Sequence, residues 1–211
     1  MNLTDVDNIS IGLGDRINPQ PGGSGKIYID DIRLQPEPPV LMPKEANTVF
    51  EAEAANILGE SWRIYHDPAS SGATHIGSRN GDGDDGDTAP GANWIATYNF
   101  TAPEGVYKIL LSVIAVDGDN DSFWVRITTA TSQTHEDPDQ PGTGWVRFNG
   151  VENSNEWLWD EVHSNDHDNE VVNWTLPAGE HTLEIGKRED GTFLDAILIT
   201  DDLALDQATL P

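Results

Sequence analysis

The chain has 211 residues, enough for one large domain or one domain and a fraction, and 37 acidic against 11 basic residues give it a net charge of −26. This charge excludes generic binding to the phosphate backbone of nucleic acids and argues against docking on anionic membranes. It suits solubility in salt, calcium binding or neutral ligands. The sequence has no cysteine and no apolar run long enough for a membrane helix.

Residues 1–36 contain two strand-like segments, Asn8–Leu13 and Lys26–Leu34, joined by a loop rich in Pro and Gly. Two strands cannot bury a core alone. The pattern of Tyr28–Leu34 (aromatic, aliphatic, Asp, any residue, Ile, any residue, aliphatic) recurs in Phe193–Ile199 near the C-terminus. We therefore interpret residues 1–36 as the C-terminal strands of a preceding β-sandwich domain.

Prolines mark the next boundary. Residues 37–46 form a Pro-rich linker, because its prolines fix φ and remove backbone donors, which favours an extended spacer. Residues 47–202 are then one domain, and residues 203–211 are a tail or linker.

The main domain shows strand patterns separated by Gly, Pro, Asn and Asp, and no helix pattern. This is typical of an all-β sandwich. The expected strands are Thr48–Ala54, Trp62–His66, Asn93–Phe100, Val106–Ala115, Ser122–Thr129, Trp145–Phe148, Trp157–Val162, Val171–Leu176, His181–Lys187 and Leu194–Thr200. The stretch Asp67–Gly91 has the character of one long loop, and loops of that length are usually functional or disordered.

Two carboxylates stand two residues apart in the first of these strands. Side chains alternate along a strand, so Glu51 and Glu53 would share one face and would need a cation or water between them. If Asp195 on the last strand lies near, three hard oxygen donors would suit Ca²⁺. A solvated strand face explains the same pattern.

The acidic turn Asp117–Asp121 leads directly into a strand that contains Trp124. Hydrogen-bond acceptors beside an aromatic plate are typical of a sugar-binding loop, because sugar C–H faces stack on rings while hydroxyls bind carboxylates and amides. Burial of Trp124 in the core, with the aspartates as a solvated turn, is the alternative.

Other tryptophans and one arginine are further candidates. Trp157 and Trp159 share one face of a strand edge, and two on one face indicate that at least one reaches solvent, whereas Trp62, Trp94 and Trp174 have the neighbours of packing residues. The turn Lys187–Thr192 holds an arginine and two acids, Arg188, Glu189 and Asp190. Arg188 could bind a ligand or pair internally with an acid to stiffen the turn.

Four segments taken together resemble a known family. They are FEAEA at residues 50–54, GVYKI at 105–109, LPAGEHTL at 176–183 and FLD at 193–195. From Val49 to Thr200 the chain resembles a carbohydrate-binding module of the family 6 / family 35 type, which implies a galactose-binding-like jelly-roll sandwich. The resemblance implies that Glu51, Glu53 and Asp195 hold a structural Ca²⁺.

The resemblance also implies a sugar cleft in loops at one end of the sandwich, and Trp157 is the best match to its aromatic residue. The sequence departs from the family at Phe193, where the family often has Asn, and near His75, where a second aromatic is expected. The predicted carbohydrate-binding residues are Asp121, Trp157, Arg188, Glu189 and Asp190.

The sequence thus predicts a non-catalytic module that binds a polysaccharide or oligosaccharide, and neutral sugars are favoured by the charge. Covalently linked neighbouring domains, in a secreted or cell-surface protein of a bacterium, are expected, with no nucleic acid or membrane as partner. Two alternatives remain. One is part of a polysaccharide-degrading hydrolase or lyase, and the other is a structural or adhesion β-sandwich.

Overall fold

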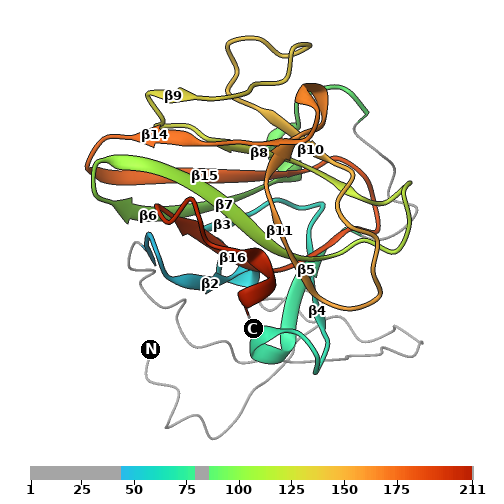
Figure 1. The fold of residues 1–211 in the computed structure, drawn as a ribbon. Helices are drawn as coiled ribbons and strands as arrows, with labels where there is room; N and C mark the ends of the chain where they lie inside the picture. Colours follow the sequence, from blue (N-terminus) through green and yellow to red (C-terminus); the bar gives the residue numbers. More distant parts are fainter. Residues whose placement is uncertain (1–43, 79–85, 211) are drawn as a thin grey trace, which may run out of the picture. The chain divides into compact units, whose positions relative to one another are not determined.

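The computed structural model describes residues 44–78 and 86–210, so residues 1–36 and most of the predicted linker lie outside the described residues. The described chain consists of β-strands, loops and short 3₁₀ turns (Figure 1). No helix within it is long and apolar enough to span a membrane. The prediction of an all-β jelly-roll sandwich is confirmed.

Two sheets make up the sandwich. The first has the order β1-β6-β15-β8-β10, with β3 paired to β6. Its strands are β1 (Lys44–Glu45), β3 (Ile57–Leu58), β6 (Ile95–Ala102), β8 (Ser122–Ile127), β10 (Val146–Asn149) and β15 (Gly179–Lys187). The second has the order β4-β5-β16-β7-β14-β9, with β11 paired to β7 and β2 to β16. Its strands are β2 (Val49–Glu51), β4 (Arg63–His66), β5 (Thr74–Gly77), β7 (Gly105–Ile114), β9 (Ser132–Gln133), β11 (Leu158–Glu161), β14 (Trp174–Leu176) and β16 (Phe193–Thr200).

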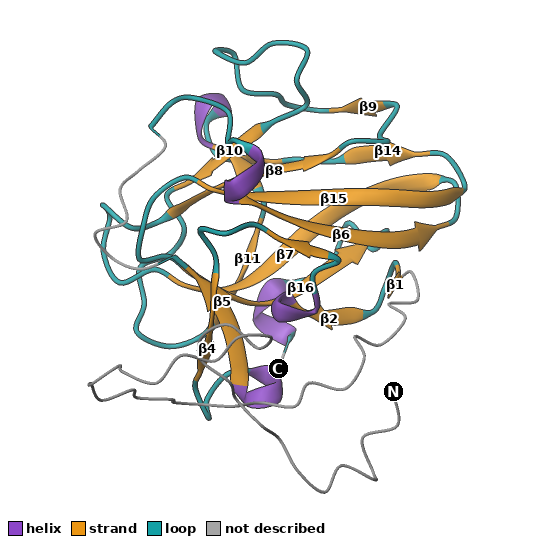
Figure 2. Cartoon of the chain, turned by 180° about the vertical axis from the view of Figure 1, so that it is seen from behind, coloured by secondary structure: helices purple, strands orange, loops and turns teal. Residues whose placement is uncertain are grey.

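Short elements complete the chain. Strands β12 (His163–Ser164) and β13 (Glu170–Val171) pair with each other. The 3₁₀ turns are η2 (Ala52–Ala54), η3 (Ser71–Ala73), η4 (Ala92–Trp94), η5 (Asn165–His167) and η6 (Gln207–Thr209). In Figure 2 many of the loops gather at the end of the sandwich away from the turn that joins β14 to β15.

The core lies between the two sheets and follows from the alternation of side chains along the strands. In β15, Leu183 and Ile185 are buried while Glu184 between them is partly exposed. The rings of Phe50 in β2 and Tyr98 in β6 lie 5.8 Å apart and join one sheet to the other. The core is therefore one continuous apolar cluster with residues from both sheets.

Several expectations about single elements were wrong, and the segment Val171–Leu176, predicted as one strand, is divided between β13 and β14. The stretch read as one loop, Asp67–Gly91, contains strand β5, which pairs with both β4 and β16. Strand β2 ends at Glu51 and is followed by the turn η2, so Glu51 and Glu53 are not on one face of a strand. A four-residue strand with little alternation gives no usable periodic signal.

The two ends of the described chain are anchored. Lys44–Glu45, placed in the linker by the sequence, forms β1 and pairs with Phe100–Thr101. The predicted tail also contacts the sandwich, because the buried Lys108 ammonium donates to the carbonyls of Leu203 (3.3 Å) and Leu205 (2.7 Å). The division of the whole chain into domains stays a prediction.

The tryptophans predicted to pack are buried in two of three cases. Trp62 and Trp174 belong to the core cluster, while Trp94 is half-buried with the Lys187 ammonium 4.5 Å from its ring centre. Trp124 is completely buried, so its interpretation as a sugar-stacking plate is wrong. Its cross-strand partner in β15 is Gly186, where a Cβ would lie 3.1 Å from the Cβ of Trp124, so there is no room for a larger residue beside it.

Replacement of Trp124 should therefore act on stability. We expect Trp124→Ala to lower the free energy of unfolding by about 3 to 5 kcal/mol, because it removes a large buried ring and leaves a cavity. Urea denaturation measures this change, and Trp124→Phe, which keeps most of the buried volume, should lose less. Unchanged stability in Trp124→Ala would contradict the burial described above.

Candidate functional site

A groove with a volume of about 690 Å³ crosses the outer face of the second sheet. Strands β2, β16, β7 and β11, which are neighbours in that sheet, form its floor. Its walls come from the segments around residues 67–71 and 155–157. The lining residues are Val49, Asp67, Ala69, Ser70, Ser71, Ser112, Ile114, Asn155, Glu156, Trp157, Trp159, Asp195 and Ala196.

A β-bulge shapes the floor of this groove. Leu194 pairs with Val113 and Ala196 with Ser112, so Asp195 is an extra residue in β16. Bulges of this kind re-aim a side chain. As a result Asp195 and Ala196 both line the groove, although they are adjacent in sequence, while Leu194 stays in the core.

The indole of Trp157 is held at the groove wall by two neighbours. Its Nε1 donates to Oδ2 of Asp67 (3.1 Å). Its ring and that of His75 are packed edge to face, with their centres 4.9 Å apart. His75 in turn stacks on Tyr65 (5.5 Å) and contacts Phe193 edge to face (5.3 Å). Trp157 is only half-buried. It is therefore a fixed aromatic plate with one part open to a ligand.

The charge of Asp67 is fixed by the same contacts. The backbone N–H of Ala69 and the indole N–H of Trp157 donate to the carboxylate and lower the pKa of Asp67. Burial lowers the pKa of His75, and the nearby Asp67 carboxylate opposes this effect. Neutral His75 and ionised Asp67 are thus the expected states at neutral pH.

An acidic cluster of Glu51, Glu53 and Asp195 adjoins the groove. Ser71 donates its backbone N–H to Oδ2 of Asp195 (3.0 Å) and its hydroxyl to Oε1 of Glu51 (2.8 Å), while the hydroxyl of Thr74 donates to Glu53. Each of the three acids keeps one buried oxygen without a partner: Glu51 Oε2, Glu53 Oε2 and Asp195 Oδ1. Burial, followed by repulsion from Glu51 and Glu53, raises the pKa of Asp195 to about 6.

The donor set of this cluster fits a hard cation. Three buried carboxylate oxygens without partners are a strained arrangement, and carboxylate oxygens are the ligands that Ca²⁺ prefers. In the described part of the chain, however, no group of three or more His, Cys, Asp or Glu side chains has its donors arranged to hold a metal ion as they stand. The structure brings the three predicted residues together, and the predicted Ca²⁺ stays a proposal.

A second group of predicted residues meets elsewhere, at the ends of β8 and β15. Arg188 Nη1 donates to Ser122 Oγ (2.8 Å), Asn149 Oδ1 (2.6 Å) and Glu189 Oε1 (2.6 Å). The backbone N–H of Asp121 donates to Glu189 Oε2 (3.0 Å). Asp190 is half-buried beside them and also has an interaction partner. Arg188 is thus engaged within the protein, which agrees with the internal pairing that the sequence left open.

The predicted sugar site is therefore divided. The structure joins Asp121, Arg188 and Glu189 in one polar network, whereas the ring of Trp157 contacts Asp67 and His75. Asp67, Ser71 and His75 were not among the predicted site residues. They lie in Asp67–Gly91, where one loop is expected from the sequence, and a loop has no strand register from which their neighbours could be predicted.

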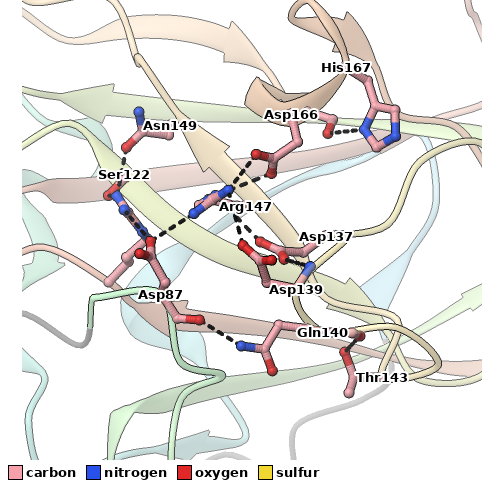
Figure 3. Close-up of polar contacts among 12 residues, drawn as sticks. Asp87, Ser122, Asp137, Asp139, Gln140, Thr143, Arg147, Asn149, Asp166 and His167 are labelled. Atoms are coloured by element: carbon pink, nitrogen blue, oxygen red, sulfur yellow. Dashed lines mark hydrogen bonds and ion pairs between the residues drawn. The ribbon is translucent and has the colours of Figure 1, made fainter.

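Arg147 forms a further network that the sequence analysis did not single out (Figure 3). Its guanidinium contacts four aspartates that come from three separate parts of the chain: Asp87 (2.7 Å), Asp137 (3.4 Å), Asp139 (3.9 Å) and Asp166. Asp87 also contacts Arg188 Nη2 at 3.4 Å. The two arginines therefore hold several loops together through one shared carboxylate.

Asp121, in the network around Arg188, should make the free energy of unfolding depend on pH. Burial raises the pKa of Asp121 to about 6, and repulsion from Glu189 adds to it, while an unfolded Asp titrates near 4. The folded state binds the proton more tightly, so this contribution to stability is present below about pH 4 and is lost as pH rises through 6.

Asp121→Asn should remove this dependence. We expect the free energy of unfolding to change less with pH between about pH 4 and 6 than in the wild type. At pH 7 the variant should be more stable by about 1 kcal/mol, a value that includes the screening of this charge by solvent. Chemical denaturation across this pH range measures both. Asp119→Asn, an exposed carboxylate of the same turn, is the control and should keep the original slope. An unchanged slope in Asp121→Asn would contradict the prediction.

No protein-family model matches this sequence, and no curated protein matches it. Similar solved structures include a β-1,3-glucan binding CBM6 from Bacillus halodurans, with 13% identity, a TM-score of 0.48, and coverage of 75% of this chain and 99% of that chain. A GH26-CBM35 β-(1,4)-mannanase from Podospora anserina has 14% identity and a TM-score of 0.49 over 75% of this chain and 28% of that chain.

A third is an exo-β-1,3-galactanase from Phanerochaete chrysosporium in complex with β-1,3-galactotriose. It has 18% identity and a TM-score of 0.47, over 73% of this chain and 29% of that chain. The match therefore spans less than a third of both enzyme chains. The similar structures include a protein of each family that the sequence resembles, family 6 and family 35.

Proposed function

We propose that this domain binds neutral polysaccharides or oligosaccharides in the groove on the outer face of its second sheet, without catalysing a reaction on them. The observation that carries the proposal is the half-buried indole of Trp157, which Asp67 and His75 hold at the groove wall. A ring held in place loses little conformational freedom when a sugar stacks on it.

The rest of the lining supports the same ligand chemistry. Val49 and Ile114 offer apolar surface to the C–H faces of a sugar ring. The exposed side chains of Asn155 and Glu156 offer hydrogen-bond donors and acceptors to its hydroxyls. The lining residues include three carboxylates and neither Lys nor Arg, so an anionic sugar would meet repulsion, and neutral sugars are favoured.

A structural Ca²⁺ belongs to the proposal, held by Glu51, Glu53 and Asp195. When bound, the ion would supply positive charge to the three buried oxygens that lack partners. Its effect in this proposal is on stability, because binding to the folded state alone lowers the free energy of that state.

The full protein is proposed to be a modular secreted or surface protein in which this domain holds linked domains close to a polysaccharide. The resemblance and the kinds of protein among the similar structures support this setting. A hydrolase or lyase activity would be the alternative. Asp67, with its low pKa and two donors, is a poor general acid, which weakens that alternative.

The first test is affinity. Trp157→Ala should weaken binding of a soluble β-1,3-glucan, β-1,3-galactan or β-1,4-mannan, whichever the wild type binds, by about thirtyfold, because loss of a stacked anchor costs about 2 kcal/mol or more. Isothermal titration calorimetry gives the affinities, and reducing-end assays on the same sugars should show no turnover.

Trp94→Ala is the matched control, because Trp94 is also half-buried but lies in η4 beside the first sheet. Its affinity should equal that of the wild type.

Arg188→Ala shows which of the two groups of predicted residues binds the sugar, the groove at Trp157 or the network around Arg188. Full binding by Trp157→Ala together with loss of binding by Arg188→Ala would place the sugar at the Arg188 network and refute the groove.

The second test is the cation. Ca²⁺ at a hundred times its dissociation constant should stabilise the protein by about 2.7 kcal/mol relative to the chelated protein. Thermal unfolding with Ca²⁺ and with chelator measures this difference. Glu53→Gln should abolish most of the response, whereas Glu60→Gln, which changes an exposed acid elsewhere, should keep it. An equal response in both variants would mean that Ca²⁺ acts on the acidic surface in general.

A further inference from the structure

The acidic cluster and the groove share two residues. Asp195 and Ser71 line the groove, and they also belong to the hydrogen-bonded cluster with Glu51. Ser71 contacts two of the three carboxylates, one through its backbone N–H and one through its hydroxyl. Any rearrangement of these carboxylates therefore changes the hydrogen bonds that hold Ser71.

Ser71 belongs to a compact segment, residues 67–73, whose ends are tied together. Asp67 N donates to Ala73 O (3.2 Å), Ser70 N donates to Asp67 O (3.1 Å), and Ala73 N donates to Ser70 O (3.1 Å). Chains of hydrogen bonds are one kind of contact through which coupling between two sites travels. The segment therefore provides a connection between Ser71 and Asp67 at its other end.

Asp67 is the residue that holds Trp157, through the 3.1 Å bond from the indole Nε1. The path from the acidic cluster to the aromatic plate is thus continuous: carboxylates, Ser71, residues 67–73, Asp67 and Trp157. Ala73 in this segment has a left-handed φ of 62°, which is unfavourable for a residue with a Cβ. The segment therefore carries backbone strain and depends on its contacts at both ends.

The carboxylates have a physical reason to change their arrangement. Their three unpartnered oxygens and like charges repel each other, and a cation would draw them together. Gly72 lies directly over the cluster, where a Cβ would be 3.5 Å from Cδ of Glu51 and 3.6 Å from Oε1 of Glu53. Contraction of the cluster would therefore act directly on residues 67–73.

We propose that a divalent cation in the cluster of Glu51, Glu53 and Asp195 regulates the groove, with residues 67–73 as the connecting element that fixes Trp157 for binding. The inference rests on the proposed function, since the site it regulates is the proposed sugar groove. By linkage, a sugar in the groove must tighten cation binding by the same factor that the cation tightens sugar binding. We expect a factor of about five to ten, the lower part of the usual range.

Ca²⁺ alone gives a direct test that needs no sugar. Titration of Ca²⁺ into the wild type should change the fluorescence of Trp157, obtained as the difference between the wild type and Trp157→Phe. Asp67→Ala should still bind Ca²⁺ by calorimetry but lose the change in Trp157 fluorescence, because the path is cut between the cluster and the ring. Glu53→Gln, which impairs the cluster itself, should lose both.

Sugar titrations with and without Ca²⁺ complete the experiment, with the soluble β-1,3-glucan, β-1,3-galactan and β-1,4-mannan as probes. A five- to tenfold gain in affinity with Ca²⁺ in the wild type, and a smaller gain in Asp67→Ala, supports the coupling. Two results overturn it: absence of Ca²⁺ binding, or Ca²⁺ binding that changes neither Trp157 fluorescence nor sugar affinity. If none of the probes binds but Trp157 still responds to Ca²⁺, the connection stands and the proposed function fails.

Discussion

The β-bulge at Asp195 is the constraint on which the functional face of this protein depends. In a regular strand Asp195 and Ala196 would point to opposite sides of the sheet, and one of them would enter the core. The bulge places both on the outer face, in the middle of the second sheet. A buried carboxylate in the core would be costly without a partner, so the bulge also lets an apolar sandwich tolerate an acid at its centre.

The bulge has a second consequence, because it brings Asp195 next to two acids from the start of the domain. Glu51, the last residue of β2, and Glu53, in the turn η2, both lie near it, and Ser71 connects the group to residues 67–73. The groove, its aromatic wall and the acidic cluster are therefore parts of one arrangement. Three cations of the described residues serve other parts of the structure: Lys108 anchors the C-terminal segment, while Arg147 and Arg188 tie loops together.

Most strands could be predicted from the sequence because their alternation is long and strong. β15, with buried residues at every second position, and β7, with a long and mainly apolar run, are examples. Strand β5 was missed because its four residues, Thr, His, Ile and Gly, show no alternation of polar and apolar side chains, whereas β4, β10 and β11, which are equally short, were predicted. That Glu51, Glu53 and Asp195 lie together was predicted from the family resemblance. The structural reason is a 3₁₀ turn and a β-bulge, and neither can be recognised from strand periodicity.

The candidate site was harder to predict than the fold, because it depends on which loop contacts which. Trp157 directly precedes β11 and Arg188 directly follows β15, so their positions in the sequence are alike. Only their contacts in the structure show that the Trp157 ring is partly open to a ligand while the Arg188 guanidinium is bonded within the protein. The most direct test is a heteronuclear NMR titration that follows the indole Nε1–H signals of the seven tryptophans. The ligand added is the β-1,3-glucan, β-1,3-galactan or β-1,4-mannan that the wild type binds. Our account predicts a shift of the Trp157 signal and little change at the buried Trp124 and Trp174; shifts confined to the residues around Arg188, with Trp157 unchanged, would contradict it.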